Sequence, residues 1–182
     1  MQAMRILALA ILLLPFGLHA DDKLWEVLKR GGQVLLIRHT ITDAGVGDPP
    51  GMKLAECATQ RNLSEEGRAH ARRIGEAFRK RQIPAGRVLS SPWCRCVETA
   101  QLAFGRAEVA EPLSNLFGRP ENRERQVAAM KKLLVKTERN LVLVSHGSTI
   151  AALTGISPGT GEMIVLTPEQ SGFRVAGRLL LE

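Results

Sequence analysis

Residues 33–40 of the chain read Q-V-L-L-I-R-H-T. Their four apolar residues, two of them β-branched, follow a Gly-Gly pair and end at Arg38 and His39. A short apolar run between turn signals is typical of a strand buried on both faces, as in a parallel sheet. A second such run, residues 141–144 (LVLV), ends just before His146. Because ligands of open α/β sheets bind beyond the carboxyl ends of the strands, we expect both histidines at one ligand-binding edge.

Helical and strand-like segments alternate along the rest of the chain. The patterns predict helices over residues 22–30, 64–81, 91–104, 122–136 and 147–153, and further strands over residues 87–90, 162–166 and 173–181. Ser64 would cap the second helix, and Ser91-Pro92 would begin the third as N-cap and first helical residue. The alternation predicts an α/β fold with three α/β/α layers around a doubly wound, mainly parallel sheet. The short connection between the last two strands predicts an antiparallel edge strand.

The first 20 of the 182 residues have the layout of a secretory signal peptide. Arg5 is followed by the wholly apolar residues 6–14, and Ala20 is a small residue before two aspartates. The apolar run is about half the roughly 20 residues that span a bilayer, although an uncleaved anchor or a buried first helix is the alternative. We therefore expect a signal peptide over residues 1–20 and one exported domain over residues 21–182.

The formal net charge of +7 comes from arginine and lysine scattered over the predicted helices. Such a field attracts anionic substrates or an anionic membrane surface. Nucleic acid is a poor partner for an exported chain with 4% aromatic residues, since single-strand binding relies on aromatic stacking.

Three cysteines lie in the predicted domain, and export permits a disulfide. Cys57 can pair with Cys94 or with Cys96, while the latter two are too close in sequence to pair with each other. One thiol would then remain free. Cys-x-Cys with one distant cysteine lacks the spacing of a zinc site, so no metal is expected.

Four side chains can be placed at the predicted ligand-binding edge: Arg38, His39, Arg95 and His146. Arginine offers a planar fork of donors that matches phosphate oxygens. The helix that begins at Gly147 adds amide donors and a positive dipole end. A neutral imidazole in that field is a nucleophile if one ring nitrogen is held as a donor. These parts describe phosphoryl transfer to histidine without a metal or another cofactor.

Other catalytic motifs do not fit. Residues 145–148 (SHGS) lack the Gly-x-Ser-x-Gly elbow of serine hydrolases. No arginine lies six residues after a cysteine, which excludes the cysteine-phosphatase arrangement. Residues 45–47 (GVG) are followed by a Pro-rich loop where a dinucleotide fingerprint needs a helix. That long loop, residues 40–57, is typical of a functional or disordered segment.

At these positions the chain resembles the histidine phosphatase superfamily, which has the phosphoglycerate-mutase-like fold. The resemblance rests on residues 36–40 (LIRHT), 63–67 (LSEEG), 90–95 (SSPWCR) with 98–100 (ETA), and 144–147 (VSHG), in the family's order. Together they span most of the predicted domain.

The resemblance implies that His39 is the phosphorylated nucleophile and that Arg38, Arg95 and His146 bind the phosphoryl group. Thr40 and Gly147 would belong to the substrate-binding positions. Arg61 either faces the mouth of the pocket or is a solvated surface arginine.

The chain is similar to exported, periplasmic phosphatases that act on lipopolysaccharide core heptose phosphates, and in size to small phosphohistidine phosphatases. The substrate would be a phosphorylated small molecule, a lipopolysaccharide phosphate or a phosphoprotein. With about 160 residues left after cleavage there is no room for a large cap domain, so we expect a fairly open pocket.

The chain departs from the mutase-type pattern where family members carry a glutamate that protonates the leaving oxygen, because Asn115 stands there and cannot act as an acid. The remaining candidates for this role are Asp43, Asp48, Glu121 and Glu124. Two interpretations follow. One is a metal-independent phosphatase that prefers good leaving groups, and the other is a non-catalytic binder of phosphorylated ligands.

Overall fold

The computed structural model describes residues 20–181. The predicted signal peptide lies outside the described residues, apart from Ala20, which begins the first helix. None of the helices in residues 20–181 has the length and apolarity needed to cross a membrane.

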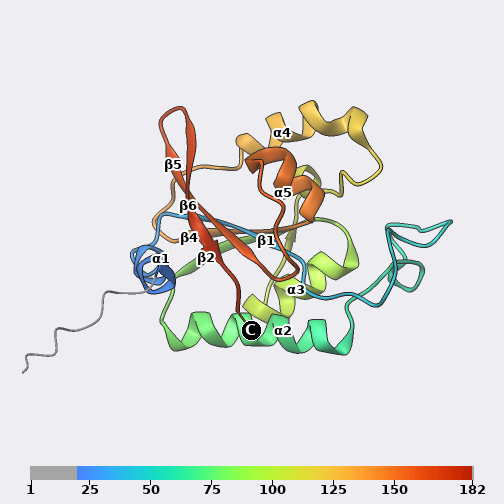
Figure 1. The fold of residues 1–182 in the computed structure, drawn as a ribbon, viewed down its shortest axis with the longest axis horizontal. Helices are drawn as coiled ribbons and strands as arrows, with labels where there is room; N and C mark the ends of the chain where they lie inside the picture. Colours follow the sequence, from blue (N-terminus) through green and yellow to red (C-terminus); the bar gives the residue numbers. More distant parts are fainter. Residues whose placement is uncertain (1–19, 182) are drawn as a thin grey trace, which may run out of the picture.

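A six-stranded sheet forms the centre of the molecule, with the strand order β3-β2-β4-β1-β5-β6 (Figure 1). Its strands are β1 (Val34–Arg38), β2 (Ala85–Ser90), β3 (Glu108–Val109), β4 (Asn140–Ser145), β5 (Met163–Glu169) and β6 (Gly172–Leu179). The strands β3, β2, β4 and β1 run parallel, whereas β5 is antiparallel to both β1 and β6. This confirms the predicted mainly parallel sheet with an antiparallel edge.

Helices cover both faces of this sheet (Figure 1). The α-helices are α1 (Ala20–Lys29), α2 (Glu65–Lys80), α3 (Cys94–Phe104), α4 (Arg123–Lys131) and α5 (Gly147–Thr154). Short 3-10 turns occupy Cys57–Thr59, Glu111–Leu113 and Pro120–Asn122. The three predicted α/β/α layers are therefore present.

The central strand β1 shows why the layers form. Leu35 and Ile37 pack into the core cluster with α1, α2 and α3, whereas Val34 and Leu36 pack into the second cluster with α4 and α5. All four side chains are fully buried. Successive side chains of a strand point to opposite faces, so four consecutive apolar residues require cover on both sides.

Two predicted helix boundaries were wrong. The third helix begins at Cys94 with Trp93 as its N-cap, not at Ser91-Pro92. The Ser91 hydroxyl accepts from His146 Nε2 at 2.8 Å and from the Trp93 amide at 3.4 Å, ahead of the helix. The fourth helix ends at Lys131 rather than at residue 136, although Leu134 still reaches the core from the turn that follows. An apolar spacing that persists through a turn looks helical in sequence.

The N-cap prediction for Ser64 was right. Its hydroxyl accepts a hydrogen bond from the Gly67 amide at 3.1 Å. Gly67 also lets α2 approach the segment after β1, since a Cβ at this position would lie 1.9 Å from the Ile41 carbonyl oxygen. The start of α2 is thereby fixed against the loop that follows His39.

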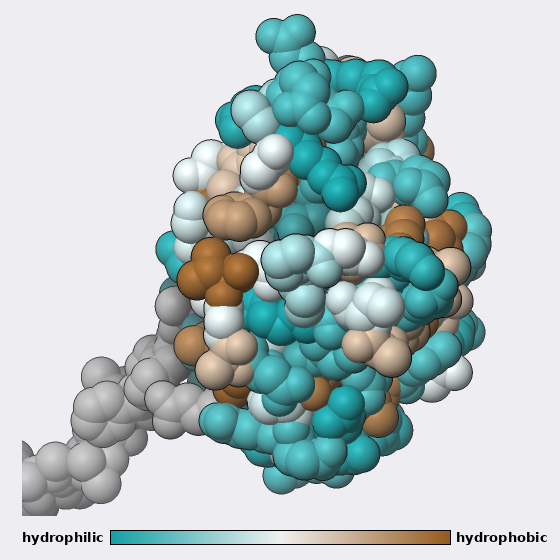
Figure 2. All heavy atoms as spheres, turned by 90° about the vertical axis from the view of Figure 1, so that its right-hand side faces the viewer, coloured by the Kyte–Doolittle hydropathy of each residue, from teal (hydrophilic) through white to brown (hydrophobic). Residues whose placement is uncertain are grey.

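The loop of residues 40–57 is tied to the domain at two points. Thr42 forms an isolated antiparallel bridge with Leu63, and Cys57 forms a disulfide with Cys94 at the start of α3. Of the two partners that the sequence left open, the structure selects Cys94, while Cys96 is free and buried. Figure 2 faces the side from which this loop projects and shows a mostly hydrophilic surface with small, separate hydrophobic patches.

Candidate active site

The adjacent parallel strands β1 and β4 bring the two histidines together. Arg38 pairs in register with Ser145, so His39 and His146 are the next residues at the same edge of the sheet. The His39 amide donates to the Ser145 carbonyl at 2.9 Å, and the two imidazole centroids are 5.5 Å apart. The carboxyl ends of β1 and β4 therefore lie side by side, as predicted.

A cavity of about 410 Å³ opens at this edge. Its charged and imidazole-bearing walls are Arg38, His39, Arg61, Arg95 and His146, and its remaining walls include Gly45, Val46, Gly47, Asn115, Phe117, Gly147, Ser148, Ser157 and Pro158. The structure thus brings all four side chains predicted as catalytic to one volume, together with Arg61 and Gly147. Arg61 faces this cavity, which decides between the two interpretations of that residue.

His39 is held as a neutral imidazole with one nitrogen free. Its Nδ1–H donates to the Thr40 carbonyl at 2.9 Å, since a carbonyl oxygen only accepts. The pKa of His39 is lowered to about 3, chiefly by burial and also by the charges of Arg95 and Arg38, while the Thr40 hydrogen bond opposes these effects. Nε2 therefore carries a lone pair at neutral pH, which is the state that a nucleophile requires.

His146 is oriented by partners on both ring nitrogens. Arginine can only donate, so the contact of 3.5 Å from Arg95 Nη2 makes Nδ1 the acceptor. Nε2 then donates to the Ser91 hydroxyl at 2.8 Å. Burial lowers the pKa of His146, and the neighbouring His39 and Arg95 lower it further. The ring is thus neutral without a ligand, and a bound anion would favour its protonated, donating form.

The three arginines of the cavity are each anchored through their terminal nitrogens. Arg38 Nη1 donates to the Pro158 carbonyl at 2.8 Å, and Arg61 Nη1 donates to the Thr42 hydroxyl at 2.7 Å. Arg95 forms a two-pronged ion pair with Asp48, at 2.6 and 3.2 Å. In all three, however, the Nε–H is buried and has no partner among the described residues.

Buried donors without partners are costly, and three of them lie around one cavity. An oxyanion with several acceptor oxygens suits the guanidinium groups that line this cavity. Three guanidinium charges against the one carboxylate of Asp48 leave an excess of two positive charges, which matches a phosphoryl dianion. The charge and the donors of the cavity therefore suit a phosphate-like anion.

Asp48 was a candidate general acid, and that hypothesis was wrong. Its carboxylate binds Arg95 and also accepts from the Trp93 indole N–H at 3.0 Å and from the Arg61 amide at 3.2 Å. Burial raises the pKa of Asp48, but the hydrogen bonds from Arg95 and Trp93 outweigh it, so that the pKa lies below its ordinary value. Asp48 has no proton to give at neutral pH and instead holds Arg95.

The other acid candidates, Asp43, Glu121 and Glu124, are not among the described residues that line the cavity. Asn115 does line it. The side-chain oxygen of Asn115 accepts from the Ser148 hydroxyl at 3.0 Å and from the Phe117 amide at 3.1 Å, which leaves its NH₂ group as a free donor. This wall of the cavity offers a hydrogen-bond donor and no carboxylic acid.

Thr40 does not line the cavity, contrary to its predicted place among the substrate-binding residues. It is fully buried, and its hydroxyl lies 3.3 Å from that of Thr99. Its carbonyl nonetheless fixes the His39 tautomer, as described above. Sequence reasoning also missed the Pro158 carbonyl and the Ser91 hydroxyl, which hold Arg38 and His146; backbone acceptors and ordinary serines carry no distinguishing sequence signal.

No cluster of three or more His, Cys, Asp or Glu side chains suited to a metal ion occurs within residues 20–181. Charge stabilisation in this cavity comes from the arginine side chains and from the amide end of α5, which begins at Gly147.

The chain is similar to known proteins in sequence and in fold. Residues 34–115 match the family model of the histidine phosphatase superfamily (branch 1), a segment that contains His39, Arg61 and Arg95. No protein with a curated description matches the sequence.

Solved structures share the fold. The protein histidine phosphatase SixA, complexed with tungstate, is 18% identical with a TM-score of 0.54, and the match covers 81% of this chain and 96% of SixA. A mycobacterial glucosyl-3-phosphoglycerate phosphatase complexed with VO3 is 19% identical with a TM-score of 0.60, covering 79% of this chain and 96% of its own. The phosphoserine phosphatase of Entamoeba histolytica, in complex with 3-phosphoglyceric acid, is 14% identical with a TM-score of 0.59, covering 82% and 98%. At these identities the likeness shows the phosphoglycerate-mutase-like architecture.

Proposed function

We propose that the chain is a histidine phosphatase, which hydrolyses a phosphomonoester, or the P–N bond of a phosphoramidate, through a phosphohistidine on His39. The match of residues 34–115 to the model of that superfamily supports the proposal. One observation carries the proposal. The free Nε2 of a neutral, buried imidazole lies in a cavity whose three arginines each hold an unpartnered Nε–H.

The reaction would proceed in two displacements. The Nε2 lone pair of His39 attacks phosphorus, a P–N bond forms, and the bond to the leaving group breaks with its electron pair on the leaving atom. Water then attacks the phosphohistidine, the P–N bond breaks, and the electron pair returns to Nε2. The net reaction consumes one water and releases phosphate and the protonated leaving group.

The cavity supplies most of the rate by positioning and charge. Arg38, Arg61 and Arg95 stabilise the equatorial oxygens in both displacements, and the amide end of α5 adds a positive dipole. His146 becomes a donor once the dianion is bound. These fixed positive charges stabilise the phosphoryl oxygens in place of a metal ion. We therefore expect activity in the presence of a chelator.

The leaving atom finds no carboxylic acid at the wall occupied by Asn115. A missing general acid costs about 10²–10⁴-fold for a poor leaving group. The enzyme should therefore act faster on aryl phosphates and phosphoramidates than on alkyl phosphates. Equal turnover of alkyl and aryl esters would contradict this part of the proposal.

The test is hydrolysis of an aryl phosphate with EDTA present, by the wild type and by His39→Ala. We expect turnover that survives the chelator and is lost in the variant, and an acid-labile phosphoryl label on wild type alone. His146→Ala should bind phosphate less tightly yet still accept the label. A label that persists in His39→Ala would refute the assignment of the nucleophile.

A non-catalytic binder of phosphorylated ligands is the second candidate, and Asn115 is the observation that favours it. In that case phosphate binding would be measurable in wild type, whereas neither turnover nor a phosphohistidine would be detected. Binding and turnover are therefore measured on the same preparation.

We further propose that the protein is exported and acts in the periplasm. Support comes from the signal-like pattern of residues 1–20 and from the Cys57–Cys94 disulfide, a bond that persists in oxidising compartments. Cleavage after Ala20 would leave the buried residues Leu24 and Trp25 of α1 in the mature protein. N-terminal sequencing of the periplasmic fraction should read Asp21 first; protein retained in the cytoplasm with an intact N-terminus would contradict export.

The candidate physiological substrates are a phosphorylated small molecule, a lipopolysaccharide heptose phosphate and a phosphoprotein. The similar solved structures are a protein histidine phosphatase, a glucosyl-3-phosphoglycerate phosphatase and a phosphoserine phosphatase. The shared architecture therefore accepts chemically different leaving groups. An activity panel over exported phosphoesters and phosphohistidine proteins would select among them. Binding to anionic vesicles would show whether the basic surface also contacts a membrane.

A further inference from the structure

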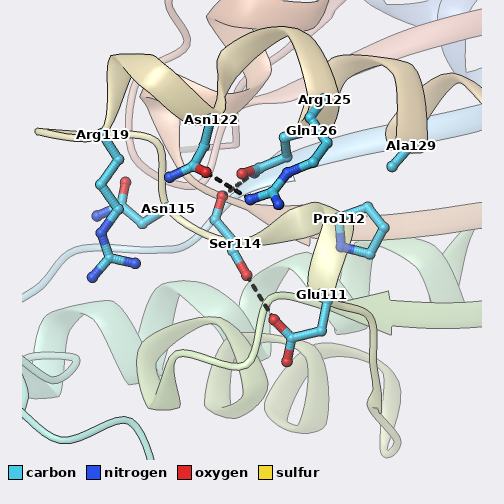
Figure 3. A pocket seen from close by; sticks show the side chains of 9 residues that line it. All are labelled: Glu111, Pro112, Ser114, Asn115, Arg119, Asn122, Arg125, Gln126 and Ala129. Atoms are coloured by element: carbon cyan, nitrogen blue, oxygen red, sulfur yellow. Dashed lines mark hydrogen bonds between the residues drawn. The ribbon is translucent and has the colours of Figure 1, made fainter.

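The cavity of about 410 Å³ that His39 and His146 line is called the phosphate cavity below. A second hollow lies beside it and shares Asn115 with it. It encloses about 360 Å³ between the 3-10 turn Glu111–Leu113 and helix α4 (Figure 3). The side chains that line it are those of Glu111, Pro112, Ser114, Asn115, Arg119, Asn122, Arg125, Gln126 and Ala129. A third hollow of about 430 Å³ also reaches Asn115 and Arg119 and shares Phe117 with the phosphate cavity. All three hollows have Asn115 in their walls, and together they are called the trough below.

Several acceptors along the second hollow are already occupied. Asn122 Oδ1 accepts from Arg125 at 2.7 Å, and the Ser114 carbonyl accepts from the Gln126 side-chain amide (Figure 3). The Ser114 carbonyl also accepts from the Thr149 hydroxyl at 2.7 Å. The oxygen of Asn115 is held by two donors, as described above. Several N–H donors of the hollow, in contrast, have no hydrogen-bond partner within residues 20–181.

Two arginines supply those donors. Neither Arg119 nor Arg125 has a carboxylate within 4.0 Å among residues 20–181. Arg125 makes its one side-chain hydrogen bond in that part of the chain to Asn122. The guanidinium of Arg119 lies 5.4 Å from the centroid of the Trp93 ring, which orients it without neutralising it. In Figure 3 Asn115 and Arg119 share one side of the hollow, and Arg125 reaches into it from α4.

The charge of the hollow is positive. Glu111 is its single acid, and that carboxylate accepts from the Ser114 hydroxyl at 3.3 Å. An apolar leaving group would find little matching surface here, because Pro112 and Ala129 are the apolar members of the wall. A leaving group that is rich in acceptors and negatively charged fits both the donors and the excess charge.

We propose that this hollow is a second anion subsite, and that the substrate carries a distal phosphate or carboxylate which Arg119 and Arg125 bind while His39 attacks the first phosphate. The inference rests on the proposed function for its catalytic half. Its binding half concerns the two arginines alone and is measured separately.

The experiment is calorimetric titration with α,ω-alkane bisphosphonates whose spacers run from one to six methylenes. Each is compared with the n-alkyl monophosphonate of the same length, and competition with inorganic phosphate shows that the phosphate cavity is occupied. At the spacer that spans the trough, the wild type should bind the bisphosphonate at least tenfold more tightly than its monophosphonate partner. Because the probes are not hydrolysed, the result does not depend on turnover.

Arg119→Ala combined with Arg125→Ala should abolish that advantage and leave monophosphonate affinity unchanged. Arg123→Ala is the matched control, because Arg123 is on the same helix, is exposed, and donates to the Ala152 carbonyl at 3.5 Å outside the hollow. It removes one positive charge and should keep the tenfold advantage.

Two results would overturn the subsite: no spacer exceeding its monophosphonate by more than twofold, or an advantage that persists in the double variant. Loss of turnover on every ester, with the bisphosphonate advantage intact, would instead overturn the proposed phosphatase function and support the anion subsite.

Discussion

Replacing Asp48 by asparagine tests whether the phosphate site is built around a buried ion pair. The Arg95 side chain is 1% exposed and that of Asp48 is 10% exposed, with 2.6 Å between Nη1 and Oδ1. Asparagine keeps the shape and one acceptor oxygen but removes the charge. The guanidinium of Arg95 then remains buried with no counter-ion in contact.

Removing one partner of a buried ion pair costs about 3–5 kcal/mol, and the retained amide oxygen places this case at the lower end. We therefore expect Asp48→Asn to lower the free energy of unfolding by about 3 kcal/mol. For a domain of this size, that corresponds to a fall in Tm of roughly 6–12 °C. Phosphate should recover part of the loss, since a bound anion supplies the missing negative charge and stabilises the folded state by mass action.

The assay is urea unfolding at neutral pH with and without phosphate, with the disulfide intact. Asp43→Asn is the matched control, because Asp43 is an exposed aspartate of the same loop and should change stability by no more than about 0.5 kcal/mol. A loss below 1 kcal/mol for Asp48→Asn, or the same phosphate increment in variant and wild type, would refute the view that Asp48 compensates Arg95.

Three further predictions concern stability. The double variant Cys57→Ser, Cys94→Ser should lower the free energy of unfolding by roughly 4 kcal/mol, which is the chain-entropy value for a separation of 37 residues. It should also abolish the effect of reductant on urea unfolding. A reductant effect that survives in the double variant would contradict this prediction. The pKa of His39 is about 3 when folded and about 6.5 when unfolded, so the unfolded state binds more protons between these values. Stability should therefore fall as pH drops from 6.5 towards 3, and His39→Asn should reduce the slope between pH 6 and 4 by about 1.4 kcal/mol per pH unit, whereas equal slopes would oppose it. Gly161→Ala should lower Tm more than Gly155→Ala. Both glycines have φ near +75°, but a Cβ at Gly161 would lie 2.2 Å from the His70 ring, whereas a Cβ at Gly155 would meet nothing within 4 Å. Similar losses of Tm in the two variants would refute the steric reason.

Much of the catalytic edge could be predicted from local sequence. Val34 to Ile37 are uninterrupted apolar residues between turn signals, a pattern typical of a strand buried on both faces. Arg38 and His39 follow that strand, and His146 follows its parallel neighbour, so the topology of parallel strands places them at one edge. Arg95 was found through its place near the start of α3, although the helix begins later than predicted.

The partners of these residues could not be predicted. Asp48 lies in a loop without periodicity, and 47 positions separate it from Arg95, so no local pattern links the two charges. The same holds for Pro158, whose carbonyl anchors Arg38 across 120 positions. Sequence reasoning offered Asp48 as an acid because a carboxyl group was needed, and the geometry gave that carboxylate a different partner.

The sequence by itself determined the layered fold and the main side chains of the candidate site, because strand burial, helix spacing and strand-end residues are properties of contiguous segments. Only the tertiary structure decided the protonation state of His39, the partner of Cys57, the role of Asp48 and the positive hollow beyond Asn115. Each of these depends on burial and on contacts between distant segments. Such contacts exist only once the loops have folded onto the sheet.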